Sequence, residues 1–242
     1  MRSRMWRRRG SLSALRLKNP STRAARGVTH LEISMSARSP SWSTLGLGLA
    51  AVLWVLTVGG GFVAMLVYKS TPGIAAAPPA SWPEASRIEP AHDKPTLVMF
   101  AHPKCTCTRA SLHELGELLA RVDEPARVVV AFVLPDGTGE DWNDTDLWHS
   151  AEAIPGVTVV ADHGSREANL FASRTSGTAL LYDAGGRLEF AGGITSMRGH
   201  EGDSLGQERM VALLNGHAAD RPTSPVFGCD LGAEPKDQGG KP

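Results

Sequence analysis

Residues 97–111 read LVMFAHPKCTCTRAS, an apolar run followed by two cysteines and the start of a helical pattern. The run predicts a buried strand over residues 96–101, and Cys105 and Cys107 stand where this strand gives way to a helix over residues 109–122. The N-terminus of a helix presents unpaired N–H groups and partial positive charge, which favour an ionised thiol. Because thiolate is the reactive form of cysteine, the stretch predicts a redox or soft-metal site, provided that solvent reaches the Cys105 thiol.

Apolar runs and helical patterns alternate along residues 91–220, which we expect to form one domain. Strands are predicted at 96–101, 127–134, 157–161, 178–182 and 187–192, and helices at 109–122, 144–154, 165–172 and 207–214. Asp183-Ala184-Gly185-Gly186 predicts a hairpin between the last two strands. Asp203 or Ser204 is expected to cap the last helix. The order predicts an α/β fold, a central mixed sheet flanked by helices with a terminal antiparallel hairpin.

The N-terminal part of the chain predicts a membrane anchor. Residues 1–43 form a basic tail with ten Lys and Arg and one acidic residue, and residues 45–68 contain no charge. A transmembrane helix over residues 44–69 is long enough, because 24 helical residues span about 36 Å and the hydrocarbon core about 30 Å. A cleaved signal peptide would have a shorter apolar region, so we favour the retained anchor. We also hypothesise that translation starts at Met35.

The charge distribution predicts how the chain is oriented and what it does not bind. The positive-inside rule puts the N-terminus in the cytoplasm. The protein would then be a single-pass protein of the inner (cytoplasmic) membrane with a periplasmic or extracellular domain. Pro-rich residues 70–90 predict an extended spacer, and residues 221–242 predict a loose C-terminal tail that carries Cys229. The acidic remainder of the chain argues against nucleic-acid binding.

The strand order, with cysteines between the first strand and its helix, resembles the thioredoxin-like fold superfamily over residues 94–216. Within it, the chain resembles the membrane-anchored redoxins called RedB. The motifs that carry this resemblance are residues 102–111 (HPKCTCTRAS), residues 192–195 (GGIT) leading into 198–203 (RGHEGD), and Phe227-Gly228-Cys229.

Several positions depart from the thioredoxin pattern. The resemblance puts Cys105 at the position of the attacking cysteine and Thr108 at that of the resolving cysteine. Gly177 and Thr178 stand where the family has Pro-Thr in the loop facing the cysteines, and Lys104 replaces the usual tryptophan. Thr178 would still offer backbone hydrogen bonds to an extended peptide.

The favoured function is thiol–disulfide exchange on the thiols and disulfides of exported proteins, without a cofactor. Cys105 would attack a disulfide, and either Cys107 or Cys229 would resolve the mixed disulfide. A bond between Cys105 and Cys107 would be strained because disulfide geometry tolerates little distortion. Lys104 would lower the pKa of Cys105, and His102 would accept or relay a proton.

Three alternatives remain open on the sequence. In the first, Cys105 and Cys107 bind copper as Cu(I), in the manner of a metallochaperone, with His102, His200 or Cys229 completing the site. In the second, the domain is a redox-inactive thioredoxin-like binding module, in keeping with the substituted loop and resolving positions. In the third, one structural disulfide forms and one thiol is left over.

Overall fold

The computed structural model describes residues 42–123, 126–135, 137–138 and 140–232. Helix α1 (Trp42–Ser70) has 29 residues and is the one helix of this described part that is long and apolar enough to cross a membrane. It is consistent with the predicted single-pass anchor at residues 44–69. The predicted start at Met35 and all but the last two residues of the basic tail lie outside the described residues.

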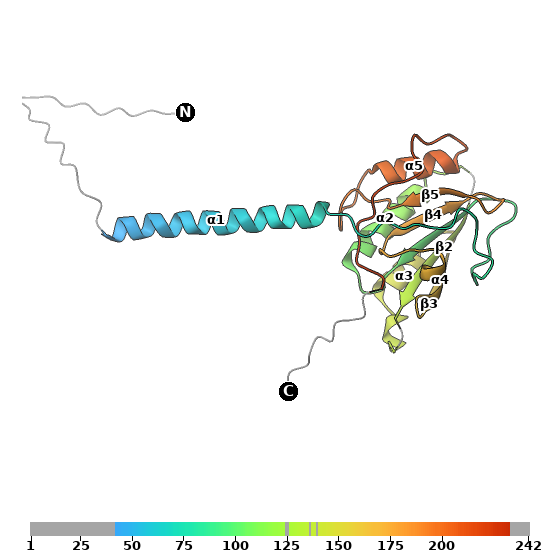
Figure 1. The fold of residues 1–242 in the computed structure, drawn as a ribbon, viewed down its shortest axis with the longest axis horizontal. Helices are drawn as coiled ribbons and strands as arrows, with labels where there is room; N and C mark the ends of the chain where they lie inside the picture. Colours follow the sequence, from blue (N-terminus) through green and yellow to red (C-terminus); the bar gives the residue numbers. More distant parts are fainter. Residues whose placement is uncertain (1–41, 124–125, 136, 139, 233–242) are drawn as a thin grey trace, which may run out of the picture. The chain divides into compact units, whose positions relative to one another are not determined.

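A five-stranded sheet with the order β3-β2-β1-β4-β5 forms the centre of the domain (Figure 1). The strands are β1 (Thr96–Ala101), β2 (Arg127–Leu134), β3 (Val157–His163), β4 (Thr178–Tyr182) and β5 (Leu188–Gly192). The first three are parallel, and β4 and β5 are antiparallel to their neighbours. The central strands β1 and β2 are continuous apolar runs because both faces of the sheet are covered. All five predicted strands are confirmed.

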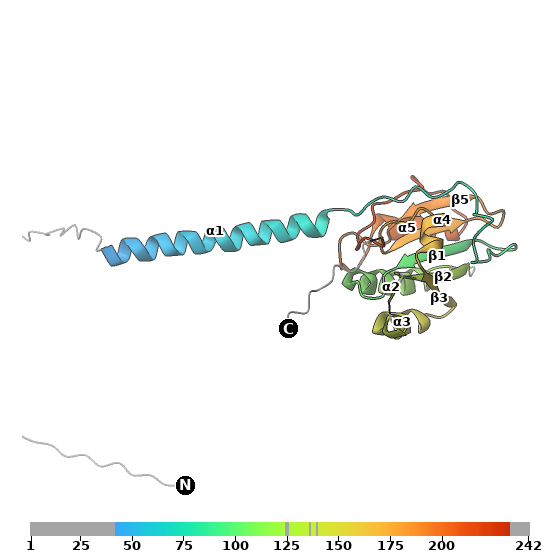
Figure 2. The same cartoon turned by 60° about the horizontal axis from the view of Figure 1, so that its bottom comes forward.

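The helices divide between the two faces of the sheet. They are α2 (Thr106–Leu119), α3 (Asp146–Glu152), α4 (Arg166–Leu170) and α5 (Leu205–Leu214), with a 3-10 turn η1 (Glu140–Trp142). Helices α2, α3 and α5 pack on the face of Leu97 and Met99, and Figure 2 shows α2 and α3 on one side of the strands. Helix α4 packs on the face of Val98 and Phe100. This is the predicted thioredoxin-like fold.

Two helix starts matter for the site. Helix α2 begins at Thr106, three residues before the predicted start, so Cys105 is its N-cap and Cys107 lies in its first turn. The Ser204 hydroxyl accepts a hydrogen bond of 3.1 Å from Gln207 N at the start of α5. The prediction that Asp203 or Ser204 caps the last helix is therefore confirmed for Ser204.

Residues 70–90 do not form the predicted spacer, because most of this segment packs on the domain. The Trp82 ring lies 5.0 Å from that of Phe171 and 5.1 Å from that of Tyr182. The Tyr182 hydroxyl donates to Pro79 O at 3.1 Å, and Ile88 is buried in the same core. Helix α4 has only 5 residues and leaves part of this apolar face open, so an extended segment covers the rest. The domain thus begins near Gly73 rather than at Ala91.

The C-terminal tail is likewise part of the domain, at least to Leu231. We call residues 222–231 the C-terminal strap. Its apolar residues Val226, Phe227 and Leu231 are buried. It forms a parallel bridge between Thr223 and Ala191 and an antiparallel bridge between Asp230 and Thr175. The predicted end of the domain at residue 220 is therefore too early, and residues 222–231 are not part of a loose tail.

Candidate functional site

Cys105 lies at the predicted junction between β1 and α2. As the N-cap residue it has an extended backbone (φ −100°, ψ 120°), and its side chain makes no capping hydrogen bond to the helix. Its backbone bridges the two elements: Cys105 N donates to His102 O at 3.2 Å, and Thr108 N donates to Cys105 O at 3.0 Å. The sulfur is therefore held beside the free N–H groups of a helix of 14 residues, where a negative charge is favoured.

The fold brings all three cysteines of the chain together. Cys105, Cys107 and Cys229 are free thiols, and each side chain lies within hydrogen-bonding reach of the other two. Their accessibility differs. Cys105 is 1 % exposed and Cys107 is 8 % exposed, whereas Cys229 is only partly buried. The expectation that solvent reaches the Cys105 thiol is wrong for this conformation, because the C-terminal strap lies against it.

Hydrogen bonds make Cys105 the most acidic of the three thiols. Its pKa is lowered mainly by the Cys107 thiol and then by the Cys229 thiol, which outweigh the opposing effect of burial. The backbone N–H groups of Cys229 and Cys107 lower it further. The pKa values of Cys107 and Cys229 are raised, first of all because each thiol donates to the Cys105 sulfur. The arrangement is that of one thiolate held by two thiols.

His102 and Lys104 flank the thiols in different roles. Burial lowers the pKa of His102, while the charge on Cys105 raises it and that on Lys104 lowers it. The Nδ1 atom of His102 accepts a hydrogen bond of 3.1 Å from Lys104 N, so the neutral ring carries its proton on Nε2. The Lys104 ammonium pairs with Asp141 at 2.6 Å and lies 4.5 Å from the Trp142 ring centre. The charge of Lys104 is therefore directed largely at Asp141 and Trp142 rather than at Cys105, whose pKa it was predicted to lower.

Thr108 joins α2 to the loop that faces the cysteines. His102 N donates to Ser176 Oγ at 2.9 Å, and Thr108 Oγ1 donates to His102 O at 3.0 Å. The hydroxyls of Thr108 and Ser176 are 2.8 Å apart, and with the other two bonds assigned, Ser176 is the donor. Each donor in this ring has one acceptor. Thr108, which stands in the place of a resolving cysteine, therefore has a structural role because it connects α2 to His102 and Ser176.

Gly177 and Thr178 form the end of that loop. Gly177 has φ +89°, and a Cβ there would lie 2.8 Å from Ser111 Oγ on α2, so the position favours glycine. Thr178 N donates to Thr175 O at 3.1 Å, and the residue pairs with Phe100 in the sheet. The prediction that Thr178 offers backbone hydrogen bonds to a peptide is therefore wrong for this structure.

The backbone that does face outward belongs to residues 174–176, and the C-terminal strap occupies it. Ser176 N donates to Cys229 O at 2.8 Å, and Leu231 N donates to Arg174 O at 2.8 Å. At Gly228 the two backbones are so close that a Cβ would overlap the Ser176 carbonyl oxygen. This close pairing, which only glycine permits, carries Cys229 to the other thiols.

Arg198 is a site residue that the sequence analysis did not assign. Its guanidinium donates to Gly228 O, and its positive charge is among the effects that lower the pKa of Cys107. It lies inside the stretch 198–203, which the family resemblance had singled out, but no local pattern indicated which residue of that stretch meets the strap.

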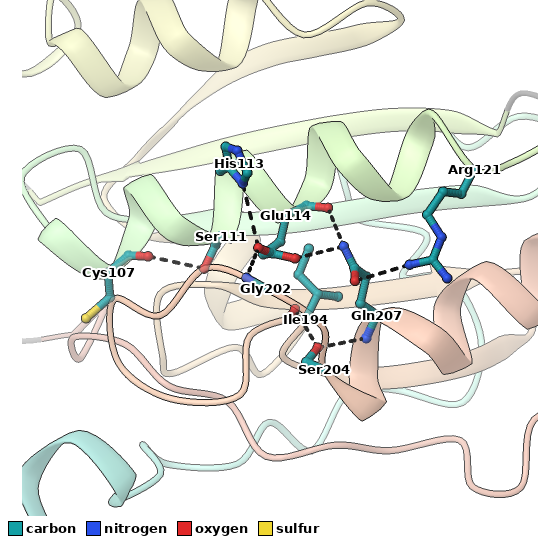
Figure 3. A network of polar contacts seen from close by, with 9 residues as sticks. All are labelled: Cys107, Ser111, His113, Glu114, Arg121, Ile194, Gly202, Ser204 and Gln207. Atoms are coloured by element: carbon teal, nitrogen blue, oxygen red, sulfur yellow. Dashed lines mark hydrogen bonds and ion pairs between the residues drawn. The ribbon is translucent and has the colours of Figure 1, made fainter. Parts of the chain in front are cut away.

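A buried polar network supports the site from behind (Figure 3). The Glu114 carboxylate, 2 % exposed, accepts hydrogen bonds from Gly202 N at 2.6 Å and from Gln207 Nε2 at 2.8 Å. Ser111 Oγ donates to Cys107 O at 3.4 Å on the same helix. The network ties α2 to α5 and to the loop before it. Sequence reasoning did not single out Glu114.

Among the described residues, no group of three or more His, Cys, Asp or Glu side chains is arranged to hold a metal ion. Cys105, Cys107 and Cys229 of the predicted copper site come together, whereas His200 is exposed and the Nδ1 atom of His102 accepts from Lys104 N.

No family model matches the sequence, and no curated protein sequence matches it either. Solved structures do match. An uncharacterized conserved protein from Geobacillus kaustophilus is 17 % identical with a TM-score of 0.47, and the match covers 69 % of this chain and 94 % of that one. A hypothetical protein from Sinorhizobium meliloti 1021 is 16 % identical with a TM-score of 0.46, covering 67 % and 96 %.

A third similar structure is the exposed lipoprotein thioredoxin Etrx1 from Streptococcus pneumoniae strain TIGR4. It is 16 % identical with a TM-score of 0.35, over 51 % of this chain and 84 % of that one. Similarities this low assign no activity. The order of the five strands and the cysteine at the start of α2 give the domain its thioredoxin-like fold.

Proposed function

We propose that the protein is a membrane-anchored, extracytoplasmic thiol–disulfide oxidoreductase that acts on exported proteins, similar to the RedB redoxins. The observation that carries the proposal is the position of Cys105 at the start of α2, where the three cysteines of the chain come together and the pKa of Cys105 is lowered. A thiolate stabilised in this way reacts with disulfides at a pH at which ordinary thiols are protonated. Cys105 is the nucleophile of the exchange, with Cys107 and Cys229 as the two available partners.

The N-terminal part of the chain supports the proposed location. Helix α1 supplies a candidate anchor, and the ten basic residues before it support a cytoplasmic N-terminus and a domain on the other side of the inner membrane. A reporter enzyme that works only outside the cytoplasm, fused after Pro242, tests this orientation. Activity of a cytoplasm-specific reporter at the same position would contradict it.

The activity is tested with the full chain in detergent. Reduced chain is mixed with a protein disulfide, oxidised chain is mixed with a reduced protein dithiol, and the change in substrate thiols is counted in each mixture. We expect Cys105→Ser to abolish the exchange, because the stabilised thiolate is lost, and Thr158→Ser, an exposed position on β3, to leave it unchanged. Undiminished exchange in the Cys105 variant would rule out the proposed role.

Burial of Cys105 favours the second candidate, a redox-inactive binding module. Such a module would show no exchange in the wild-type chain, and its three thiols would stay reduced in an excess of oxidised glutathione. The copper alternative stays a prediction, which an anaerobic Cu(I) titration of the wild-type and Cys105→Ser/Cys107→Ser chains addresses directly.

A further inference from the structure

The three sulfurs of the site are not equally placed to meet a second protein. Cys105 and Cys107 are 1 % and 8 % exposed, so neither can be approached without a movement of the chain. Cys229 is the most accessible of the three, and it sits on an extended segment rather than on a helix. Exchange requires the incoming sulfur to contact the sulfur that it attacks, so accessibility selects the first reacting atom.

The strap holds Cys229 in the manner of a bound peptide. An antiparallel bridge joins Thr175 to Asp230, Ser176 N donates to Cys229 O, and Leu231 N donates to Arg174 O. Addition of a strand to exposed backbone is a common mode of peptide recognition. Here the added strand belongs to the chain itself, so the backbone of residues 174–176 is already paired.

The strap is also part of the core. Val226 and Phe227 are buried beside Cys229, Gly73 N donates to Val226 O at 2.8 Å, and the Arg198 guanidinium holds Gly228 O. A partner that had to reach Cys105 would have to displace these contacts. A partner that meets Cys229 displaces none of them.

We propose that Cys229 is the sulfur that exchanges with the partner, that Cys105 exchanges only with Cys229, and that the substrate is a reduced protein dithiol. This inference rests on the proposed thiol–disulfide exchange and changes its first contact: Cys229 meets the partner, and Cys105 is the nucleophile only toward Cys229. Cys107, inside the first turn of α2, then acts as a hydrogen-bond donor to Cys105 rather than as its disulfide partner.

The three cysteines are free thiols, so a disulfide compound such as oxidised glutathione must first accept two electrons, which leaves it as two thiols and joins Cys105 to Cys229. A thiolate of the substrate attacks Cys229 Sγ, the bond between the two sulfurs of the chain breaks, and Cys105 leaves as a thiolate. The second substrate thiolate then attacks the substrate sulfur of the mixed disulfide. Cys229 leaves and takes up a proton, and the substrate has lost two electrons to the chain.

The same geometry gives the direction of exchange. A thiol that ionises easily is a good leaving group. Cys105 is the thiol at the N-terminus of α2, where negative charge is favoured, and its pKa is lowered there. Stabilisation of the reduced form makes the disulfide more oxidising. Reduced dithiols are therefore the expected substrates.

The test locates the mixed disulfide. Full-length Cys107→Ser chain in detergent is oxidised to the Cys105–Cys229 disulfide and mixed with reduced glutathione as the probe. The reaction is quenched with acid, the chain is unfolded, and free thiols are alkylated with N-ethylmaleimide. We expect mass spectrometry to find glutathione on Cys229 and maleimide on Cys105, in at least tenfold excess over the reverse arrangement.

Glutathione on Cys105, or an even distribution, would overturn the inference while leaving the proposed function intact. A peptide map of the oxidised wild-type chain is the second measurement, and it avoids any effect of the substitution on folding. It should contain a Cys105–Cys229 disulfide, and a Cys105–Cys107 disulfide in its place would also overturn the inference. If no disulfide forms in the wild-type chain, the proposed function itself fails.

Discussion

Replacement of Gly228 by alanine should uncover Cys105 without touching any of the three thiols. A Cβ at this position would overlap the Ser176 carbonyl oxygen and lie 2.9 Å from its carbonyl carbon. Carbon atoms in contact are normally about 3.5–4.0 Å apart, so the carbon contact alone requires the two backbones to separate by roughly 0.6 Å, and the overlap with the oxygen requires more. The neighbouring atoms belong to the backbone, so no side-chain rotation can relieve the overlap.

The expected cost falls on the strap rather than on the whole domain. Overpacking of a tight contact costs about 1–3 kcal/mol. The hydrogen bond from Ser176 N to Cys229 O, 2.8 Å long, is the nearest one to be weakened. A cost of about 2 kcal/mol raises the population of the open strap roughly 30-fold.

The assay measures how fast iodoacetamide alkylates Cys105 in the native, reduced full chain, with the modified residue identified by mass spectrometry. The rate should rise by roughly the same factor of 30, because alkylation follows the open population when the strap opens and closes rapidly. Gly185→Ala is the matched control, since the atom nearest to its Cβ would be Asp183 Oδ1, at 3.3 Å. An unchanged Cys105 rate alongside a lowered melting temperature would refute the idea that the strap covers this thiol.

Three further predictions concern pH and stability. Between pH 5 and 8 the free energy of unfolding of the reduced chain should rise with pH relative to Cys105→Ser, by at most about 1.4 kcal/mol per pH unit. The reason is that the unfolded Cys105 thiol holds a proton that the folded thiol, with its lowered pKa, has lost. Equal dependence of the unfolding free energy on pH in urea titrations of the two chains would contradict this. Thr108→Val removes a hydroxyl that contacts Ser176 and should cost about 1–3 kcal/mol in the same titration, with Thr108→Ser as the control. Trp82→Ala should lower the free energy of unfolding by about 3 kcal/mol, since the ring packs on Tyr182. A loss below about 0.5 kcal/mol, on the scale of an ordinary surface substitution, would indicate that residues 70–90 are a spacer after all.

The sheet and its helices could be predicted because their sequences are periodic. The buried run over β2 and the apolar stripe that includes Leu112, Leu115 and Leu118 on α2 each carry a signal that repeats along the element. The cysteine at the start of α2 followed from the same reasoning, because the end of a strand and the start of a helix fix the position between them.

The two extended segments could not be predicted in this way. Residues 70–90 are rich in proline and alanine, and the strap contains a single short apolar stretch, so neither has a period that distinguishes a packed segment from a solvated one. What orders them is the sheet face of Val98 and Phe100, which the short helix α4 leaves partly uncovered. This uncovered part of the sheet face exists only once the whole fold is assembled.

Burial of Cys105 is easier to reconcile with function when the three thiols are considered as one unit. Water stabilises an exposed thiolate. A thiolate beneath the strap keeps its charge only because protein N–H and S–H groups replace that water. Two of those donors belong to Cys229, its thiol and its backbone N–H, so the residue that covers Cys105 also stabilises its charge. Formation of a bond between these two sulfurs would remove the charge and the donor together. For this reason we interpret the strap as half of the proposed redox centre rather than as a barrier in front of it.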